Sequence, residues 1–389
     1  MQLHRRVFFI AGFDPKSPRY YHQLYRGLAR HRAPGAEGHD GPPPKVGPRR
    51  ALNDWADEWD VSWPRPDGAA PLVTRYTVLR WDDIVRRHWA RGMRTVWRDH
   101  WLFYVDGWRQ GFFRRTWQGS RRNWMFVTFP LALLLAWTLL TLALGAGVMG
   151  VLSATGASAA SVVAMAAIVA GAHWSWRRMS HWLGADWLMR LYGFSHAQAA
   201  GQLEGLQQRI DAMAALIRES GDADTPAREL LVVGHSAGAT LAASALSRAL
   251  APLASSLAPT PEFALLTLGH CIPLVYLFET AQDLREELDS LVADRRLTWV
   301  DYTAPADWAG CAEIPPWPRP GAARLLRLSP RFPQILDAQR YQSLRRNRLA
   351  MHMQYLKPPD RAGSYDLLAF TAGAQTLRER HPGATSGMP

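Results

Sequence analysis

Short apolar runs of the chain alternate with longer segments in which apolar residues recur at helical spacing. Strands are predicted where β-branched and aromatic residues cluster, at 5–11, 72–79, 229–233, 263–269 and 296–302. Helices are predicted between these runs, at 20–30, 237–250 and 281–294. Strands that alternate with helices are typical of an α/β fold, here with a mostly parallel sheet flanked by helices.

Residues 33–71 break this alternation. The segment is rich in proline and glycine and includes three consecutive prolines at 42–44. This composition disfavours regular hydrogen-bonded structure, so we predict a long surface loop there. The sequence leaves open whether this loop, or the segment 81–121 that follows, covers an active site as a lid.

The most apolar part of the chain is the 54-residue segment 123–176, which contains no Asp, Glu, Lys or Arg. One membrane-spanning helix needs about 20 apolar residues, so the segment predicts a transmembrane hairpin with spans at about 124–144 and 157–175. Small residues in the second span would let it pack closely against the first. The alternative is a helical hairpin buried in a soluble domain, but a chain of this size could hardly surround so long an uncharged segment.

Tryptophan and arginine dominate the approach to this hairpin, residues 81–121. Trp89, Met93, Trp97 and Trp101 recur every four residues and predict one shared helical face. Aromatic and arginine side chains together suit helices in a membrane interface, and packing on the folded core is the alternative. Arginines flank both ends of the uncharged segment, so the positive-inside rule predicts that both ends face the cytoplasm.

This pattern divides the chain into four parts. We expect the first part of an α/β domain at 1–80, interfacial helices and the hairpin at 81–195, the second part of the domain at 196–375, and a flexible tail at 376–389. The expected location is a membrane, such as the bacterial inner membrane, with the α/β domain in the cytoplasm. Anionic membrane lipids would account for the net charge of +12, and no nucleic-acid-binding motif competes with that explanation.

One pentapeptide carries the strongest chemical signal: Gly234-His235-Ser236-Ala237-Gly238, a G-x-S-x-G motif. It lies between a predicted strand and a predicted helix. A sharp turn at this point would lift Ser236 out of the backbone, and the flanking glycines would remove side chains that collide there. The new helix would also point its N-terminal N–H groups toward the serine, where negative charge develops during acyl transfer.

With its strand–turn–helix context, the motif resembles the nucleophile elbow of the α/β-hydrolase superfamily, especially its lipase-like serine esterases. The resemblance covers residues 1–80 and 195–375, and its specific matches are short motifs. It implies that an acid and then a histidine follow the serine along the chain. Asp307 lies in the loop after a predicted strand and Asp301 within it. We favour Asp307, because active-site groups gather at strand ends, and keep Asp301 as the alternative acid.

Only two histidines follow these acids, His352 and His381. His381 belongs to the Gly- and Pro-rich tail. His352 is favoured, and its His-x-x-Tyr segment resembles the catalytic-histidine segment of related hydrolases. The resemblance also implies an oxyanion hole made by the N–H of Ala237 and an N–H near Phe13, in the loop after the first strand.

The expected activity is hydrolysis of a carboxylic ester by Ser236, Asp307 and His352 through an acyl-enzyme, without a metal or organic cofactor. The expected partners are the ester, which a membrane location makes lipid-like, and membrane lipids, but not nucleic acid. An acyltransferase on the same fold and a non-catalytic membrane-attached scaffold remain alternatives. The two cysteines, Cys271 and Cys311, form no pattern typical of a disulfide framework or metal cluster. The sequence specifies neither the substrate nor the oligomeric state.

Overall fold

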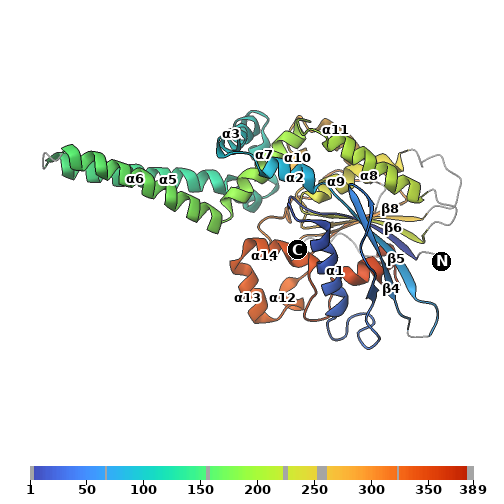
Figure 1. Cartoon of the computed structure of the whole chain (residues 1–389). Helices are drawn as coiled ribbons and strands as arrows, with labels where there is room; N and C mark the ends of the chain where they lie inside the picture. Colours follow the sequence, from blue (N-terminus) through green and yellow to red (C-terminus); the bar gives the residue numbers. More distant parts are fainter. Residues whose placement is uncertain are drawn as a thin grey trace.

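The computed structural model describes residues 4–65, 68–154, 158–221, 227–251, 261–321 and 324–382. These residues form a nine-stranded sheet with helices on both faces, and a pair of long helices projects from one end (Figure 1). The predicted α/β class, with a mostly parallel sheet flanked by helices, is confirmed.

The strands follow the order β2-β4-β5-β1-β6-β7-β8-β9, and β3 pairs with β4. Their bounds are β1 Arg5–Ile10, β2 Lys45–Val46, β3 Arg50–Asn53, β4 Ala56–Trp63, β5 Leu72–Leu79, β6 Glu229–His235, β7 Glu262–Leu268, β8 Leu297–Tyr302 and β9 Arg324–Leu328. From β5 to β9 every neighbouring pair is parallel, whereas the pairs that involve β4 are antiparallel. Parallel pairing brings the carboxyl ends of β1, β6, β7 and β8 to one edge of the sheet, where α/β folds commonly place ligands.

Side chains of the central strands fill two apolar cores, one on each face of the sheet. On β6, Leu230 and Val232 belong to one core, and Leu231 and Val233 belong to the other. Because both faces are buried, the central strands are apolar at almost every position, which is why they stand out in the sequence.

Helices cover both faces of the sheet (Figure 1). One face carries α8 (Leu206–Gly221), α9 (Gly238–Leu250), α10 (Pro273–Tyr276) and α11 (Gln282–Ala293). The other carries α1 (Pro18–Arg30), α12 (Phe332–Ile335), α13 (Ala338–Arg346), α14 (Arg348–His352), the 3₁₀ helix η2 (Met353–Leu356), α15 (Leu367–Ala372) and α16 (Leu377–Arg380). The tail predicted from residue 376 therefore begins with a packed helix, in which Leu377 is fully buried; residues 383–389 lie outside the described ranges.

The surface loop predicted at 33–71 is wrong for residues 45–63. β2, β3 and β4 lie there, and β4 pairs with β5 along its whole length. Trp59, Val61 and Trp63 are buried, whereas the polar side chains between them are half-buried. This period of two is the signal of a strand with one face in the core, and the flanking prolines and glycines obscured it.

The segment before the projecting pair forms three helices, α2 (Asp82–Trp89), α3 (Met93–Arg109) and α4 (Phe112–Gly119). The single helical face predicted through Trp89, Met93, Trp97 and Trp101 is wrong. Helix α2 ends at Trp89, and a separate helix, α3, begins at Met93 with Gly92 as its N-cap. Several tryptophans of these helices are nevertheless exposed to solvent: Trp101, Trp108 and Trp117.

The projecting pair consists of α5 (Arg121–Ala154) and α6 (Ser158–Trp182), and α7 (Ala185–Ala199) returns the chain to the α/β body (Figure 1). Trp137 Nε1 donates to Ser175 Oγ at 3.3 Å across the pair. Among the described residues, one helix, α5, is long and apolar enough to cross a membrane. Only 6 % of its most apolar 18-residue stretch is buried. Helices of this composition also occur in the cores of soluble proteins, where they are mostly buried.

The prediction of two spans is therefore recovered only in part. The first, at 124–144, lies within α5. The second, at 157–175, coincides with α6 from Ser158 on, and residue 157 lies outside the described ranges; among the described residues, α6 is not found to be a candidate span.

Candidate active site

Ser236 occupies a strained turn between β6 and α9. Its φ of 58° is in the left-handed region, and Arg331 is the one other non-glycine residue in the described ranges with a positive φ. The Ser236 N–H donates to the carbonyl oxygen of Leu268 at 2.9 Å, which ties the turn to the end of β7. A left-handed backbone costs roughly 1–3 kcal/mol for such a residue and persists only where the surroundings impose it. The strand–turn–helix context predicted for the motif is therefore present.

Three glycines make this turn possible. A Cβ on Gly234 would lie 2.5 Å from Ala239 Cα, and a Cβ on Gly238 would lie 2.2 Å from the carbonyl oxygen of Ala11. Gly12, two residues after β1, lies against the serine itself, because a Cβ added there would be 2.7 Å from Ser236 Cβ. The glycines let the first strand, the turn and the new helix approach to backbone contact distance.

The favoured acid, Asp307, and the favoured histidine, His352, are in hydrogen-bonding contact. Asp307 lies in the loop after β8, and its Oδ2 is 2.8 Å from His352 Nδ1 at the end of α14. The backbone N–H of Ala309 donates to Oδ1 at 3.0 Å, and the Tyr355 hydroxyl donates to Oδ2 at 3.1 Å. Burial alone would raise the pKa of Asp307, but the charge of His352 and these hydrogen bonds outweigh burial and hold the pKa below its usual value. The carboxylate is thus ionised and oriented toward the imidazole.

The alternative acid, Asp301, faces different partners. It lies within β8, where its carboxylate accepts hydrogen bonds from the hydroxyls of Thr267 at 2.7 Å and Thr303 at 3.1 Å. The nearest histidine is His270, with Nε2 3.7 Å from Oδ2. Burial raises the pKa of Asp301 to about 7. His381 lies elsewhere, beside the ring of Tyr302.

Ser236 and His352 are not joined by a hydrogen bond. Ser236 Oγ lies 3.6 Å from Cys271 Sγ, and burial raises the pKa of that thiol to about 12, so the thiol is neutral. His352 Nε2 is buried and has no partner in the described part of the chain. His235, next to the serine, reaches the histidine from the other side, with Nε2 3.0 Å from the carbonyl oxygen of His352. Burial and the neighbouring His352 lower the pKa of His235 to about 3, so His235 is neutral.

The predicted oxyanion donors are both free. Within the described ranges, the backbone N–H groups of Phe13 and Ala237 donate to no carbonyl or side chain. β1 and β6 pair with Ile10 opposite Gly234, and this register carries the residues after β1 alongside Ser236. The ring of Phe13 is turned into a cluster with Phe194, at a centroid distance of 5.0 Å, which fixes the loop.

The sequence did not predict the contacts that α5 and α7 make around this site. Asn123 Nδ2, in the first turn of α5, donates to the carbonyl oxygen of Gly310 at 3.3 Å, three residues beyond Asp307. The Trp187 ring, on α7, lies 6.0 Å from the imidazole of His352. These contacts join residues far apart in sequence, so no local pattern could have indicated them. Ser236, Asp307 and His352 are each at most 2 % exposed, and the site is closed in this conformation.

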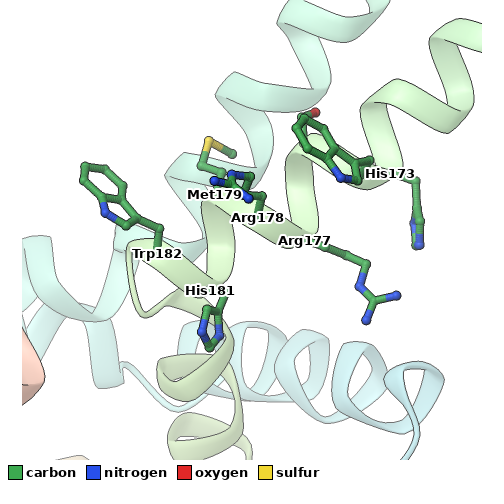
Figure 2. Close-up of a pocket in the computed structure, with 8 residues that line it drawn as sticks. His173, Arg177, Arg178, Met179, His181 and Trp182 are labelled. Atoms are coloured by element: carbon green, nitrogen blue, oxygen red, sulfur yellow. The ribbon is translucent and has the colours of Figure 1, made fainter.

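A large surface hollow lies away from this site. It has a volume of about 970 Å³ and is lined by α6 alone, between His173 and Trp182 (Figure 2). The labelled side chains point to different sides of that helix, so they do not converge on a common ligand. We give more weight to the buried residues Ser236, Asp307 and His352, because the last two are hydrogen-bonded to each other and His235, next to Ser236, contacts His352. In the described ranges, no three His, Cys, Asp or Glu side chains are placed to hold a metal ion.

Comparison with known proteins adds no relative. No protein-family model, curated protein or solved structure matches the chain. The fold and the geometry of the site are therefore the observations that bear on function.

Proposed function

We propose that the chain is a membrane-anchored serine hydrolase that cleaves carboxylic esters. Ser236 is the nucleophile, His352 the general base and Asp307 the group that orients the imidazole. The observation that carries the proposal is the 2.8 Å contact between His352 Nδ1 and Asp307 Oδ2, which leaves Nε2 buried and, in the described ranges, unpaired. The imidazole ring lies 4.9 Å from that of His235, the residue before Ser236. A serine hydroxyl needs such a base, because the hydroxyl alone is a weak nucleophile.

The acylation step follows from these positions. In the proposed mechanism Ser236 Oγ leaves Cys271 Sγ and hydrogen-bonds to His352 Nε2 when substrate binds, since catalytic hydrogen bonds often tighten only in the substrate complex. Oγ then attacks the ester carbonyl carbon while Nε2 takes the hydroxyl proton. The C–O bond to the alcohol breaks, and the imidazolium returns the proton to the leaving alkoxide. Asp307 keeps its negative charge throughout and stabilises the imidazolium.

The Phe13 and Ala237 N–H groups hold the carbonyl oxygen as it becomes negative, which is worth about 3–4 kcal/mol for a single donor in comparable sites. Water then attacks the acyl-serine with His352 again as base, and the carboxylic acid leaves. The predicted oxyanion hole lies next to the first turn of α9, whose dipole adds to the stabilisation of the same charge.

The membrane anchor is α5 with α6 beside it. Support comes from the exposure of the apolar side chains of α5, such as Leu139 at 66 % and Leu140 at 70 %, which would be unfavourable in water. Arginines 121, 122, 177 and 178 lie at the same end of the helix pair, near the α/β body. We therefore place that body on the cytoplasmic side by the positive-inside rule.

Fluorophosphonate labelling tests the proposal. The purified full-length protein should be labelled covalently, and Ser236→Ala should lose labelling and ester hydrolysis together. Ser244→Ala is the matched control, because Ser244 is a buried serine of the adjacent helix α9 and should leave labelling intact. Equal labelling of Ser236→Ala and wild type would refute the assignment. Absence of labelling in the wild type, with the fold intact, would favour a scaffold.

A further inference from the structure

The segment that carries His352 also carries a second group to the same carboxylate. α14 ends at His352 and continues directly as the 3₁₀ helix η2, which begins at Met353. In a 3₁₀ turn, residues i and i+3 project from the same side. His352 and Tyr355 are three residues apart, and both reach Asp307 Oδ2, at 2.8 Å and 3.1 Å. Two side chains of one short segment, His352 and Tyr355, therefore contact the same oxygen, Asp307 Oδ2.

The direction of the Tyr355 hydroxyl hydrogen follows from its other partner. The backbone N–H of Ala304 donates to the Tyr355 oxygen at 2.8 Å. An N–H cannot accept a hydrogen bond, so the hydroxyl must use its own hydrogen elsewhere. Asp307 Oδ2 is the acceptor within reach. The Tyr355 hydroxyl therefore donates to the Asp307 carboxylate and accepts from the backbone N–H of Ala304.

The tyrosine ring is held in place on several sides. Gly269, with φ of +53°, leaves the necessary space, since a Cβ there would lie 2.7 Å from Tyr355 Cε2. The hydroxyl of Tyr365 donates to the backbone carbonyl of Tyr355 at 2.6 Å. The side chain is completely buried. A ring fixed in this way presents its hydroxyl at one position with little entropy left to lose.

Tyr355 differs from the other buried tyrosines nearby. Tyr302 and Tyr365 donate to backbone carbonyls, of Ser364 and Tyr355 respectively, which is the usual way to satisfy a buried hydroxyl. Tyr355 instead donates to a carboxylate, and hydrogen bonds to ionised acceptors are roughly twice as strong as neutral ones. This difference separates a role at Asp307 from a role in packing alone.

We propose that Tyr355 is a positioning residue of the hydrolase: its hydroxyl holds the Asp307 carboxylate in the rotamer that orients His352. The inference rests on the proposed function and deepens it. Ala309 anchors Oδ1 and Tyr355 anchors Oδ2, so the carboxylate is fixed at both oxygens before the imidazole becomes charged. Preorganisation of this kind acts on the chemical step more than on substrate binding.

Tyr355→Phe tests this role with a short p-nitrophenyl ester as substrate. We expect kcat to fall about tenfold with KM unchanged, as for loss of one hydrogen bond to a charged group. The acidic limb of the kcat/KM profile should also move to higher pH, because a carboxylate that has lost a donor is protonated more easily. Tyr302→Phe is the matched control, a buried hydroxyl bonded to a backbone carbonyl, and should move neither kcat nor the pH profile.

A second variant separates positioning from packing. Replacement of Tyr355 by 3-fluorotyrosine keeps the hydroxyl but makes it a stronger donor, so the acidic limb should move to lower pH. This variant decides the question if Tyr355→Phe does not fold. An unchanged pH profile in both variants, with an active wild type, would overturn the role of Tyr355 and leave the hydrolase proposal standing. A wild type without esterase activity or labelling would overturn the hydrolase proposal instead.

Discussion

Two buried histidine–aspartate pairs lie near the carboxyl ends of β7 and β8, and they differ in almost every respect that matters for the proposed catalysis. His352 and Asp307 are 2.8 Å apart, and the carboxylate has two further donors. His270 and Asp301 are 3.7 Å apart, and the donors to that carboxylate are threonine hydroxyls. The pKa of Asp307 is lowered, whereas burial raises the pKa of Asp301 to about 7.

The difference follows from where each aspartate lies. Asp301 is the second-last residue of β8, and its donors are the hydroxyls of Thr267 on β7 and of Thr303 just after β8. Asp307 is in the loop after the same strand, where it can meet a backbone N–H, a tyrosine and a histidine from elsewhere in the chain. Burial penalises both carboxylates, and only a set of strong donors reverses that penalty. A strand-end loop therefore provides an ionised, oriented acid, and the strand interior does not.

The largest expected effect comes from exchanging each acid for its amide. Asp307→Asn should reduce kcat by a factor on the order of 10³–10⁴, because the amide no longer orients or stabilises the imidazolium. Asp301→Asn should change kcat less than about tenfold, since no step uses His270. Steady-state ester hydrolysis of the two variants, with thermal unfolding as a check on the fold, measures the contrast. A larger loss of kcat in Asp301→Asn than in Asp307→Asn would contradict the assignment of Asp307 as the acid.

A smaller effect concerns the dependence of stability on pH. The folded chain keeps Asp301 protonated up to about pH 7, whereas an unfolded aspartate loses its proton near pH 4, roughly its reference value. Between these values the folded state binds the extra proton, so the free energy of unfolding falls as the pH rises from about 4 to about 7. Asp301→Asn should flatten this part of the melting-temperature profile.

Asp307 should change the pH dependence of the unfolding free energy in the opposite direction to Asp301. Its lowered pKa contributes stability above the unfolded value, and that stability is lost as the pH falls through the folded pKa. Asp307→Asn should therefore alter only the acidic end of the profile. If both substitutions change the same pH range in the same direction, the two carboxylates do not differ as described.

The smallest expected effect is at the junction between α5 and the acid loop. Asn123→Ala removes the donor to the carbonyl oxygen of Gly310 and should cost about 1 kcal/mol of loop stability. We expect a fall of a few fold in kcat, since the loop that holds Asp307 becomes less ordered. Thr376→Ala, which removes the side-chain cap of α16 at Glu379, is a control for a lost hydrogen bond away from the proposed catalytic residues. Equal kcat in Asn123→Ala and wild type would mean that α5 does not support the site.

Much of the fold could be predicted from sequence because its signals are local. The central strands are buried on both faces and therefore uniformly apolar, and the G-x-S-x-G motif marks its own turn. β4 was missed because its alternation at Trp59, Val61 and Trp63 is short and lies between proline-rich segments. The break after Trp89 was missed because a four-residue repeat of aromatic residues persists across it.

The contacts of the site depended on information that is not local. Position in the loop after a strand selected Asp307, chain order and the exclusion of His381 selected His352, and the structure brings these two side chains together. The sequence could not indicate that Tyr355 shares the same carboxylate oxygen, that Asn123 reaches the acid loop, or that Cys271 lies beside the serine. Each of these contacts is set by the packing of distant segments.

The central claim is that Ser236 is the nucleophile of this site. Its most direct test is to treat the full-length protein with a fluorophosphonate probe, digest it, and locate the adduct by mass spectrometry. The account predicts a single adduct on the peptide that contains Ser236, formed much more slowly in Asp307→Asn and at a near-normal rate in Asp301→Asn. An adduct on another serine, or a rate that is insensitive to Asp307, would contradict it.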